Sequence, residues 1–218
     1  MRGYLKAVAA FGMMAALASP AMAQGRGGMG GGMMGGAAGL IGNPSIQKEL
    51  KLDEAQIKKA GEVAQDARAK MQDLRSSLDG LEGEARTKKM QELGRSSNEE
   101  AILTLGTFLK PEQLKRYKEI SLQQRGASAL SDPAIVSALK VTDEQAGKVK
   151  TILADSQSQM REIQQSAGDD RQGAMQKMLT HRKETQTKVM ALMTDDQKKS
   201  WKEMTGEPFD VTYQRPNN

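Results

Sequence analysis

The chain has 218 residues, with 32 Lys and Arg against 27 Asp and Glu, and a formal net charge of +5. It contains no cysteine, which excludes disulfide bonds and cysteine-ligated metal centres. Aromatic residues make up only 3% of it, and charges of both signs are interleaved, which disfavours nucleic-acid binding because that function calls for clustered basic residues with stacking aromatics. With so few large apolar side chains, we expect an all-α fold of extended helices that share narrow apolar interfaces.

The first 23 residues have the pattern of a cleavable secretory signal. Two basic residues open the chain, an apolar run follows over residues 7–18, and Ala21-Met22-Ala23 matches the small-x-small cleavage pattern. The run is too short to span a bilayer. We therefore expect cleavage after Ala23 and a periplasmic or secreted protein without a membrane span. An uncleaved anchor is the alternative.

Residues 24–42 form a segment rich in Gly and Met, which we expect to be a disordered leader because ordering glycine is entropically costly. Met29, Met33 and Met34 are soft ligands that could take Cu(I). Soft-ligand sites normally include Cys or His as well, so a plain linker is the favoured interpretation and no metal or other cofactor is expected.

Two stretches of the chain recur. Residues 43–52 return 89 residues later at 132–141, and residues 109–120 return 84 residues later at 193–204. The start and the end of one unit are therefore duplicated, with a loop about five residues shorter in the second copy. The expected parts are helical repeat 1 (43–120), a linker (121–131), helical repeat 2 (132–205) and a C-terminal tail (206–218).

Each copy contains small and apolar residues at heptad spacing. In the first copy these are Ile57, Ala60, Ala64, Ala67, Met71, Leu74 and Leu78. In the second they are Ala146, Val149, Leu153, Ser156, Met160, Ile163 and Ala167, with Ser156 as the polar exception. The pattern predicts a helix of about 25 residues in each copy, packed closely on a partner helix.

A second helix is expected in each copy, over about 84–109 and 171–193. Turns are expected at 79–83 and 168–170, where Gly and Asp gather. Shorter helices are expected to begin near Pro44, Pro111, Pro133 and Asp195.

Four short motifs lie at expected helix starts: 52–56 (Leu-Asp-Glu-Ala-Gln), 109–113 (Leu-Lys-Pro-Glu-Gln), 141–145 (Val-Thr-Asp-Glu-Gln) and 193–197 (Met-Thr-Asp-Asp-Gln). Three are capping boxes, in which an acceptor side chain and a glutamine cap the same helix start. In the remaining motif, at 109–113, Lys110 offers no acceptor. The candidate residues are structural: Asp53, Gln56, Gln113, Thr142, Gln145, Thr194 and Gln197.

These motifs, in two matched pairs behind a signal-like segment, resemble the Leu-Thr-x-x-Gln motif family of bacterial periplasmic proteins (Spy/CpxP-like). The resemblance covers about residues 43–205 and excludes the leader, and none of the four motifs carries Leu and Thr together. It implies a thin, curved, all-helical protein that binds unfolded polypeptide without ATP, as antiparallel dimers of helical hairpins do in that family. Because one chain here holds two such units, we expect an elongated, monomeric pseudo-dimer.

No catalytic constellation is evident, so we expect no enzyme. His181 is the only histidine and is expected on a helix surface, since one His without Cys cannot build a metal centre. Paired acids fall at 99–100, 169–170 and 195–196, where a turn, a helix start or a solvated face explains them. Tyr117 and Trp201 occupy equivalent repeat positions, which favours a packing role.

The favoured function is an ATP-independent chaperone or envelope-stress binding protein whose partners are unfolded or partly folded proteins. Long charged side chains with apolar stems and adaptable Met side chains suit loose binding of such chains. A metal-responsive periplasmic sensor or resistance protein is the alternative, although the chain is poor in metal ligands. A structural helical adaptor is the third hypothesis, which sequence does not separate from the first.

Overall fold

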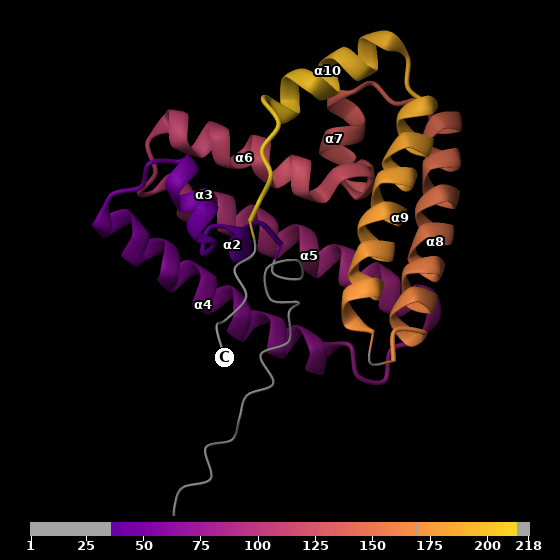
Figure 1. Cartoon of the computed structure of the whole chain (residues 1–218), viewed down its shortest axis with the longest axis horizontal. Coiled ribbons are helices and arrows are strands. Elements are labelled where there is room, and N and C mark those ends of the chain that lie inside the picture. Colours follow the sequence, from indigo (N-terminus) through magenta and orange to yellow (C-terminus); the bar gives the residue numbers. More distant parts are fainter. Residues whose placement is uncertain (1–35, 169, 213–218) are drawn as a thin grey trace, which may run out of the picture.

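The computed structural model describes residues 36–168 and 170–212, which form helices and no strand (Figure 1). The predicted all-α fold is therefore confirmed. The elements are α2 (Gly36–Leu40), α3 (Pro44–Glu49), α4 (Glu54–Ser77), α5 (Gly83–Gly106), α6 (Pro111–Arg125), the 3-10 helix η1 (Gly126–Ser131), α7 (Pro133–Ala138), α8 (Asp143–Gln165), α9 (Arg171–Ala191) and α10 (Asp195–Thr205). No helix in the described part combines the length and apolarity that crossing a bilayer requires. The signal-like segment 1–23 and residues 24–35, including Met29, Met33 and Met34, lie outside the described residues.

Two long helical hairpins, α4–α5 and α8–α9, form the frame of the molecule (Figure 1). The first turns at Gly80 and Gly83, with φ of 77° and 54°, and the second at Gly168, with φ of 47°. Glycine suits these turns because it adopts positive φ without steric cost. The breaks predicted at 79–83 and 168–170 thus coincide with the ends of the helices.

Only some of the heptad residues of the first copy lie on the buried face of α4. Ala60, Ala64, Ala67 and Leu78 are buried, but Ile57 is 41% exposed, so its predicted place in the interface is wrong. The reason is local: in this first turn of α4 the buried position is taken by Gln56, which is 7% exposed. In α8, Val149 is buried and the other heptad residues are half-buried.

Two separate hydrophobic cores hold the two units. The first includes six residues with no exposed surface: Ile41, Ile46, Ala60, Leu105, Tyr117 and Ile120. The second contains Leu139, Val149, Val189 and Met193, with the half-buried Trp201 packed against it. Tyr117 and Trp201, equivalent in the repeat, therefore each pack against the core of a different unit.

The last residues of the expected leader belong to the first core. Ala38 and Leu40 in α2 and Ile41 directly after it are buried, and α2 contacts both α4 and α5, so the prediction of disorder is wrong for residues 36–42. Burial of Leu and Ile side chains offsets the entropic cost of ordering the neighbouring glycines. Gly42 permits the close approach, because a Cβ there would lie 2.8 Å from the Cβ of Ala64.

The segment expected as a linker has the same role in the second unit. α6 extends to Arg125, and η1 follows it directly, with Ala127, Ala129 and Leu130 buried. These three residues lie 89 positions after Ala38, Leu40 and Ile41, which is the offset of the repeat. Each unit therefore begins about seven residues before the recognisable repeat, and residues 126–131 are a core element as well as a connection.

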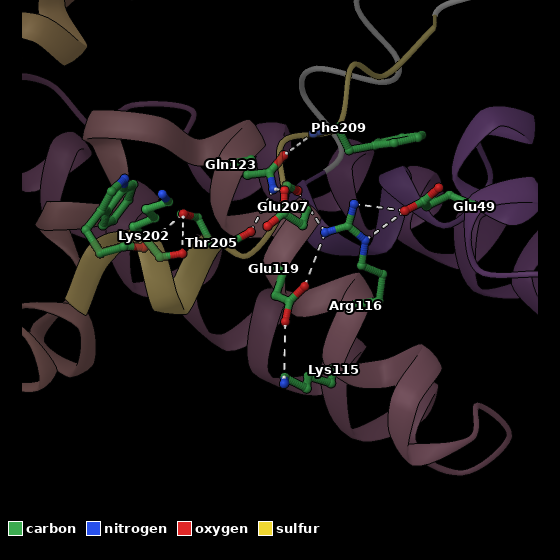
Figure 2. A network of polar contacts seen from close by, with 10 residues as sticks. Glu49, Lys115, Arg116, Glu119, Gln123, Lys202, Thr205, Glu207 and Phe209 are labelled. Atoms are coloured by element: carbon green, nitrogen blue, oxygen red, sulfur yellow. Dashed lines mark hydrogen bonds and ion pairs between the residues drawn. The ribbon is translucent and has the colours of Figure 1, made fainter. Parts of the chain in front are cut away.

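The units meet through α6 and α10, which are equivalent helices of the two copies. From α10 the chain continues as residues 206–212, here called the C-terminal strap, which crosses to the first unit (Figures 1 and 2). Gln123 on α6 holds it: Nε2 donates to the carbonyls of Thr205 and Glu207 (2.7 Å each), and Oε1 accepts from the N–H of Phe209 (2.9 Å). Nη1 of Arg116 also donates to the Glu207 carbonyl, at 2.9 Å.

The far part of the strap is packed on the first core. Phe209 and Val211 contact that core, and the N–H of Thr212 donates to Oγ of Ser45 at 3.2 Å. Arg116 is held from its other side by Glu49, at 2.8 Å (Figure 2). The C-terminus of the second unit is thus fixed by polar and apolar contacts to the first.

Alkaline pH should destabilise the protein through Tyr117. Burial raises the pKa of its phenol above the ordinary value of 10.0, and this outweighs the opposing effect of the Ile41 backbone near the hydroxyl. The folded state therefore holds this proton more tightly, so the stability that Tyr117 contributes is complete below about pH 10 and falls as the pH rises above it. In urea unfolding from pH 8 to pH 11, Tyr117→Phe should lose less stability than the wild type. Identical pH profiles would contradict this.

Candidate functional site

The motif glutamines lie in a reciprocal pair at the base of each hairpin. In the first unit, Nε2 of Gln56 donates to Oε1 of Gln113 at 2.8 Å, and Nε2 of Gln113 donates to Oε1 of Gln56 at 3.2 Å. Both side chains are 7% exposed. Because Gln56 opens α4 and Gln113 opens α6, the pair joins two helix starts that are 57 residues apart in the chain.

Each glutamine of the pair also caps two helices. Oε1 accepts from the N–H of its own N-cap residue, at 3.1 Å from Asp53 and 2.9 Å from Lys110. The second Nε2 hydrogen reaches the end of another helix: Gln56 donates to the carbonyl of Phe108 beyond α5, and Gln113 to that of Leu50 beyond α3, each at 3.0 Å. Helix ends leave N–H and C=O groups without partners, and the two amides satisfy four such groups.

The second unit repeats the arrangement. Gln145 and Gln197 exchange hydrogen bonds of 2.9 and 3.0 Å, and their Nε2 atoms donate to the carbonyls of Leu192 (2.7 Å) and Lys140 (3.1 Å). Their Oε1 atoms accept from the N–H groups of their N-cap residues, Thr142 (3.0 Å) and Thr194 (2.9 Å). The capping residues singled out in the sequence are therefore brought together in space as two glutamine pairs, a feature that the motifs alone did not indicate.

The N-cap side chains differ among the four motifs. Oδ1 of Asp53 accepts from the N–H of Gln56 at 2.8 Å, and Oγ1 of Thr142 and of Thr194 each accepts from the glutamine N–H three residues on, at 3.2 Å. Lys110 makes no such bond, since an ammonium has no acceptor. The motif at 109–113 is therefore half a capping box: Gln113 accepts from the N–H of Lys110, but the Lys110 side chain caps nothing.

We therefore expect unequal costs of truncation at the caps. Thr142→Ala and Thr194→Ala should each lower the free energy of unfolding by about 1 kcal/mol, the usual cost of a lost N-cap. Lys110→Ala should change it little, because no capping bond is lost. Urea unfolding of the three variants measures this, and equal losses at all three positions would show that these side chains do not act as caps.

A cavity of ≈ 350 Å³, here called the α4–α5 pocket, lies between the helices of the first hairpin. Its apolar lining comes from Ala38, Val63, Ala67, Ala101 and Phe108. Its rim is charged, with Lys59, Glu62, Asp66, Lys70 and Glu100. The lining is made mostly of small side chains, so the two helices leave the space between them unfilled.

Both rim lysines are engaged with neighbouring groups. Nζ of Lys70 lies 3.0 Å from Oδ2 of Asp66 on its own helix and also contacts Glu100 on α5, so that it spans the pocket. The hydrogen bond to Glu100 is the main reason why the pKa of Lys70 is raised. Nζ of Lys59 lies 5.8 Å from the centre of the Phe108 ring, a cation–π distance. Glu62 forms no ion pair with any described residue.

The equivalent place in the second hairpin is closed by polar side chains. Oγ of Ser156 lies 2.8 Å from Nε2 of His181 and 3.0 Å from Oγ1 of Thr185, which in turn donates to the His181 carbonyl at 2.9 Å. His181 is 7% exposed, so its expected place on the surface is wrong. The reason is its partner: Ser156, the polar exception in the heptad pattern, satisfies the imidazole inside the hairpin.

The described residues do not show the arrangement of side chains that a metal site requires. Within 36–168 and 170–212, no three His, Asp or Glu side chains gather so as to hold a metal ion. The remaining features are the glutamine pairs, which are structural, and the α4–α5 pocket, which is open to solvent. No protein-family model, characterised protein or solved structure matches the chain.

Proposed function

We propose that the protein is an exported, ATP-independent chaperone or envelope-stress binding protein that engages unfolded or partly folded polypeptide. The α4–α5 pocket is the observation that carries the proposal, because it combines an apolar floor with a charged rim. An unfolded chain presents the complementary pattern, in which apolar side chains alternate with charged ones and with polar backbone. Export is supported by the signal-like pattern of residues 1–23.

The chemistry of this surface suits weak, reversible binding. Covering one bulky apolar side chain contributes about 1.5–3 kcal/mol, too little to trap a client permanently. The rim residues Lys59 and Lys70 have apolar stems below their charged groups. These stems add contact area with a client and do not require the client to adopt one geometry. The resemblance of the four motifs to the Leu-Thr-x-x-Gln family supports the same function.

We further infer that the two units form a pseudo-dimer within one chain. The contact of the equivalent helices α6 and α10, and the C-terminal strap that fixes the second unit to the first, support this inference. The protein would then need no second copy and should elute as a monomer at micromolar concentration. Size exclusion with light scattering distinguishes this from a stable dimer, which would argue against it.

An aggregation assay tests the proposed function. A chain starting at Gln24 should suppress the aggregation of a chemically denatured client on dilution, without nucleotide and in a dose-dependent way. The same protein unfolded beforehand is the control for unspecific effects. If the folded protein is no better than an equal mass of an inert helical protein, the proposal fails.

A further inference from the structure

We propose that the α4–α5 pocket selects client segments in which a bulky apolar side chain is flanked by Arg or Lys, and that only the first unit has this site. This deepens the proposed function and rests on it, since it names the class of segment that the protein would bind. The inference is carried by three observations: the difference between the units, the lining of the pocket and the charge of its rim.

The two units differ at three equivalent positions. Ala67, Ser97 and Ala101 line the pocket of the first hairpin, and the repeat offsets of 89 and 84 residues place Ser156, His181 and Thr185 at the same positions of the second. The larger polar set fills its hairpin with mutual hydrogen bonds, whereas the small set leaves ≈ 350 Å³ open. The duplicated fold has therefore kept one unit closed and left the other with a cavity.

The lining of the cavity favours an apolar group. Its volume is at the lower end of the ~300–1,000 Å³ of ligand pockets in proteins, which leaves room for a bulky side chain and part of the adjoining backbone. Ala67 and Ala101 are buried in the floor, and Phe108 offers an aromatic face at one end. The open side faces solvent, so a segment of a longer chain can enter without opening the hairpin.

The rim favours basic flanks. It carries three carboxylates and two ammonium groups, and both ammonium groups already have partners, in Asp66 and Glu100 for Lys70 and the Phe108 ring for Lys59. Among the described residues, Glu62 is the rim carboxylate without an ion-pair partner. An Arg or Lys beside the inserted side chain would meet this carboxylate, while a Glu would be repelled. Exposed pairs are weak, so the preference should be about threefold to fivefold.

Labelled peptides test the selectivity. Three fluorescein-labelled Gly/Ser peptides carry a central Arg-Phe-Arg, Glu-Phe-Glu or Arg-Ala-Arg, and fluorescence anisotropy measures their binding to a chain starting at Gln24. The Arg-Phe-Arg peptide should bind most tightly, the Glu-Phe-Glu peptide about threefold to fivefold more weakly at low salt, and the Arg-Ala-Arg peptide at least about tenfold more weakly. Equal binding of all three would overturn the proposal.

The second unit supplies the variant that closes the pocket. Ala67→Ser, Ser97→His and Ala101→Thr together place the polar set of the second hairpin in the first, and binding of the Arg-Phe-Arg peptide should fall at least about tenfold. The matched control, Ser158→Ala with Thr180→Ala, alters exposed positions of the other hairpin and should leave peptide affinity unchanged. Undiminished binding by the folded triple variant would overturn the proposal.

An exposed substitution keeps the test decisive if the triple variant does not fold. Glu62 lies on the solvent face of α4. Glu62→Lys should abolish or reverse the preference for peptides with Arg flanks, while a central Phe should remain preferred over a central Ala. An unchanged preference would refute the role of the rim. Aggregation suppression by a pocket-closed variant that no longer binds peptide would separate the two claims: the chaperone function would stand and the pocket as its site would fall. If the protein binds the Arg-Phe-Arg peptide but does not suppress aggregation, the pocket would stand as a peptide-binding site and the chaperone function would fall.

Discussion

Replacing Gln113 by Leu should lower the free energy of unfolding by about 3 kcal/mol, one of the largest effects of any single substitution in the chain. The carbonyl of Leu50 and the amide of Gln56 would each lose a partner in a buried place, and the part-buried N–H of Lys110 would lose one as well. Each buried polar group left without a partner costs about 1–3 kcal/mol, partly offset by the apolar volume of Leu. Urea unfolding followed by circular dichroism measures the loss.

Two controls isolate the role of the amide. Gln113→Glu keeps the size of the side chain and an acceptor for Lys110, but it has no hydrogen to donate to Leu50 or Gln56, so it should be as destabilising as Leu at pH 7. Gln157→Leu, on an exposed position of α8, should change stability by less than about 0.5 kcal/mol. If Gln113→Leu costs no more than Gln157→Leu, the glutamine pair does not hold the base of the hairpin.

Ending the chain after Gly206 should also lower the free energy of unfolding by about 3 kcal/mol. The truncation removes the half-buried Phe209 and Val211 from the first core and leaves the amide of Gln123 without two of its partners. Because the C-terminal strap fixes the second unit to the first, the two units should also unfold less cooperatively. Calorimetry and urea unfolding report both effects.

Single substitutions locate the effect within the strap. Phe209→Ser should cost about 1–2 kcal/mol, because a half-buried aromatic side chain is lost, whereas Asp210→Ser at the exposed neighbour should have little effect. A truncated protein as stable and as cooperative as the full chain would show that the strap contributes nothing to the contact between the units.

The sequence was sufficient for features that depend on residues close together in the chain. The all-α fold and the helix starts at Pro44, Pro111, Pro133 and Asp195 follow from heptad spacing and from capping chemistry that acts over three or four residues. The clusters of Gly and Asp at 79–83 and 168–170 located the turns of both hairpins. The hydrogen bonds of the N-cap residues Thr142 and Thr194 likewise depend on local backbone geometry alone.

Features set by contacts across the fold could not be predicted. Periodicity placed Ile57 in the interface, but a tertiary contact of Gln56 took the buried position. Composition indicated disorder for residues 36–42, yet burial of Leu40 and Ile41 against α4 and α5 outweighs the cost of ordering the glycines. The one available signal was the repeat itself, since the sequence 89 residues later is also small and apolar at Ala127, Ala129 and Leu130.

The candidate site shows the same division. The four motif glutamines were recognised as caps, but their pairing across 57 and 52 residues required the folded chain. His181 looked like a surface residue because no local signal linked it to Ser156, 25 positions earlier. The α4–α5 pocket could not be predicted either, because a cavity forms only where facing positions of two packed helices both carry small side chains.

Binding of a permanently unfolded client tests the central claim most directly. A fluorescent protein ligand that is kept unfolded by reduction and alkylation of its cysteines is titrated with a chain starting at Gln24, and anisotropy follows the complex without nucleotide. The account predicts saturable binding in the micromolar range, competition by the unlabelled unfolded client, and no binding of the same client in its native, disulfide-bonded form. No saturable binding, or equal binding of the native and unfolded forms, would contradict it.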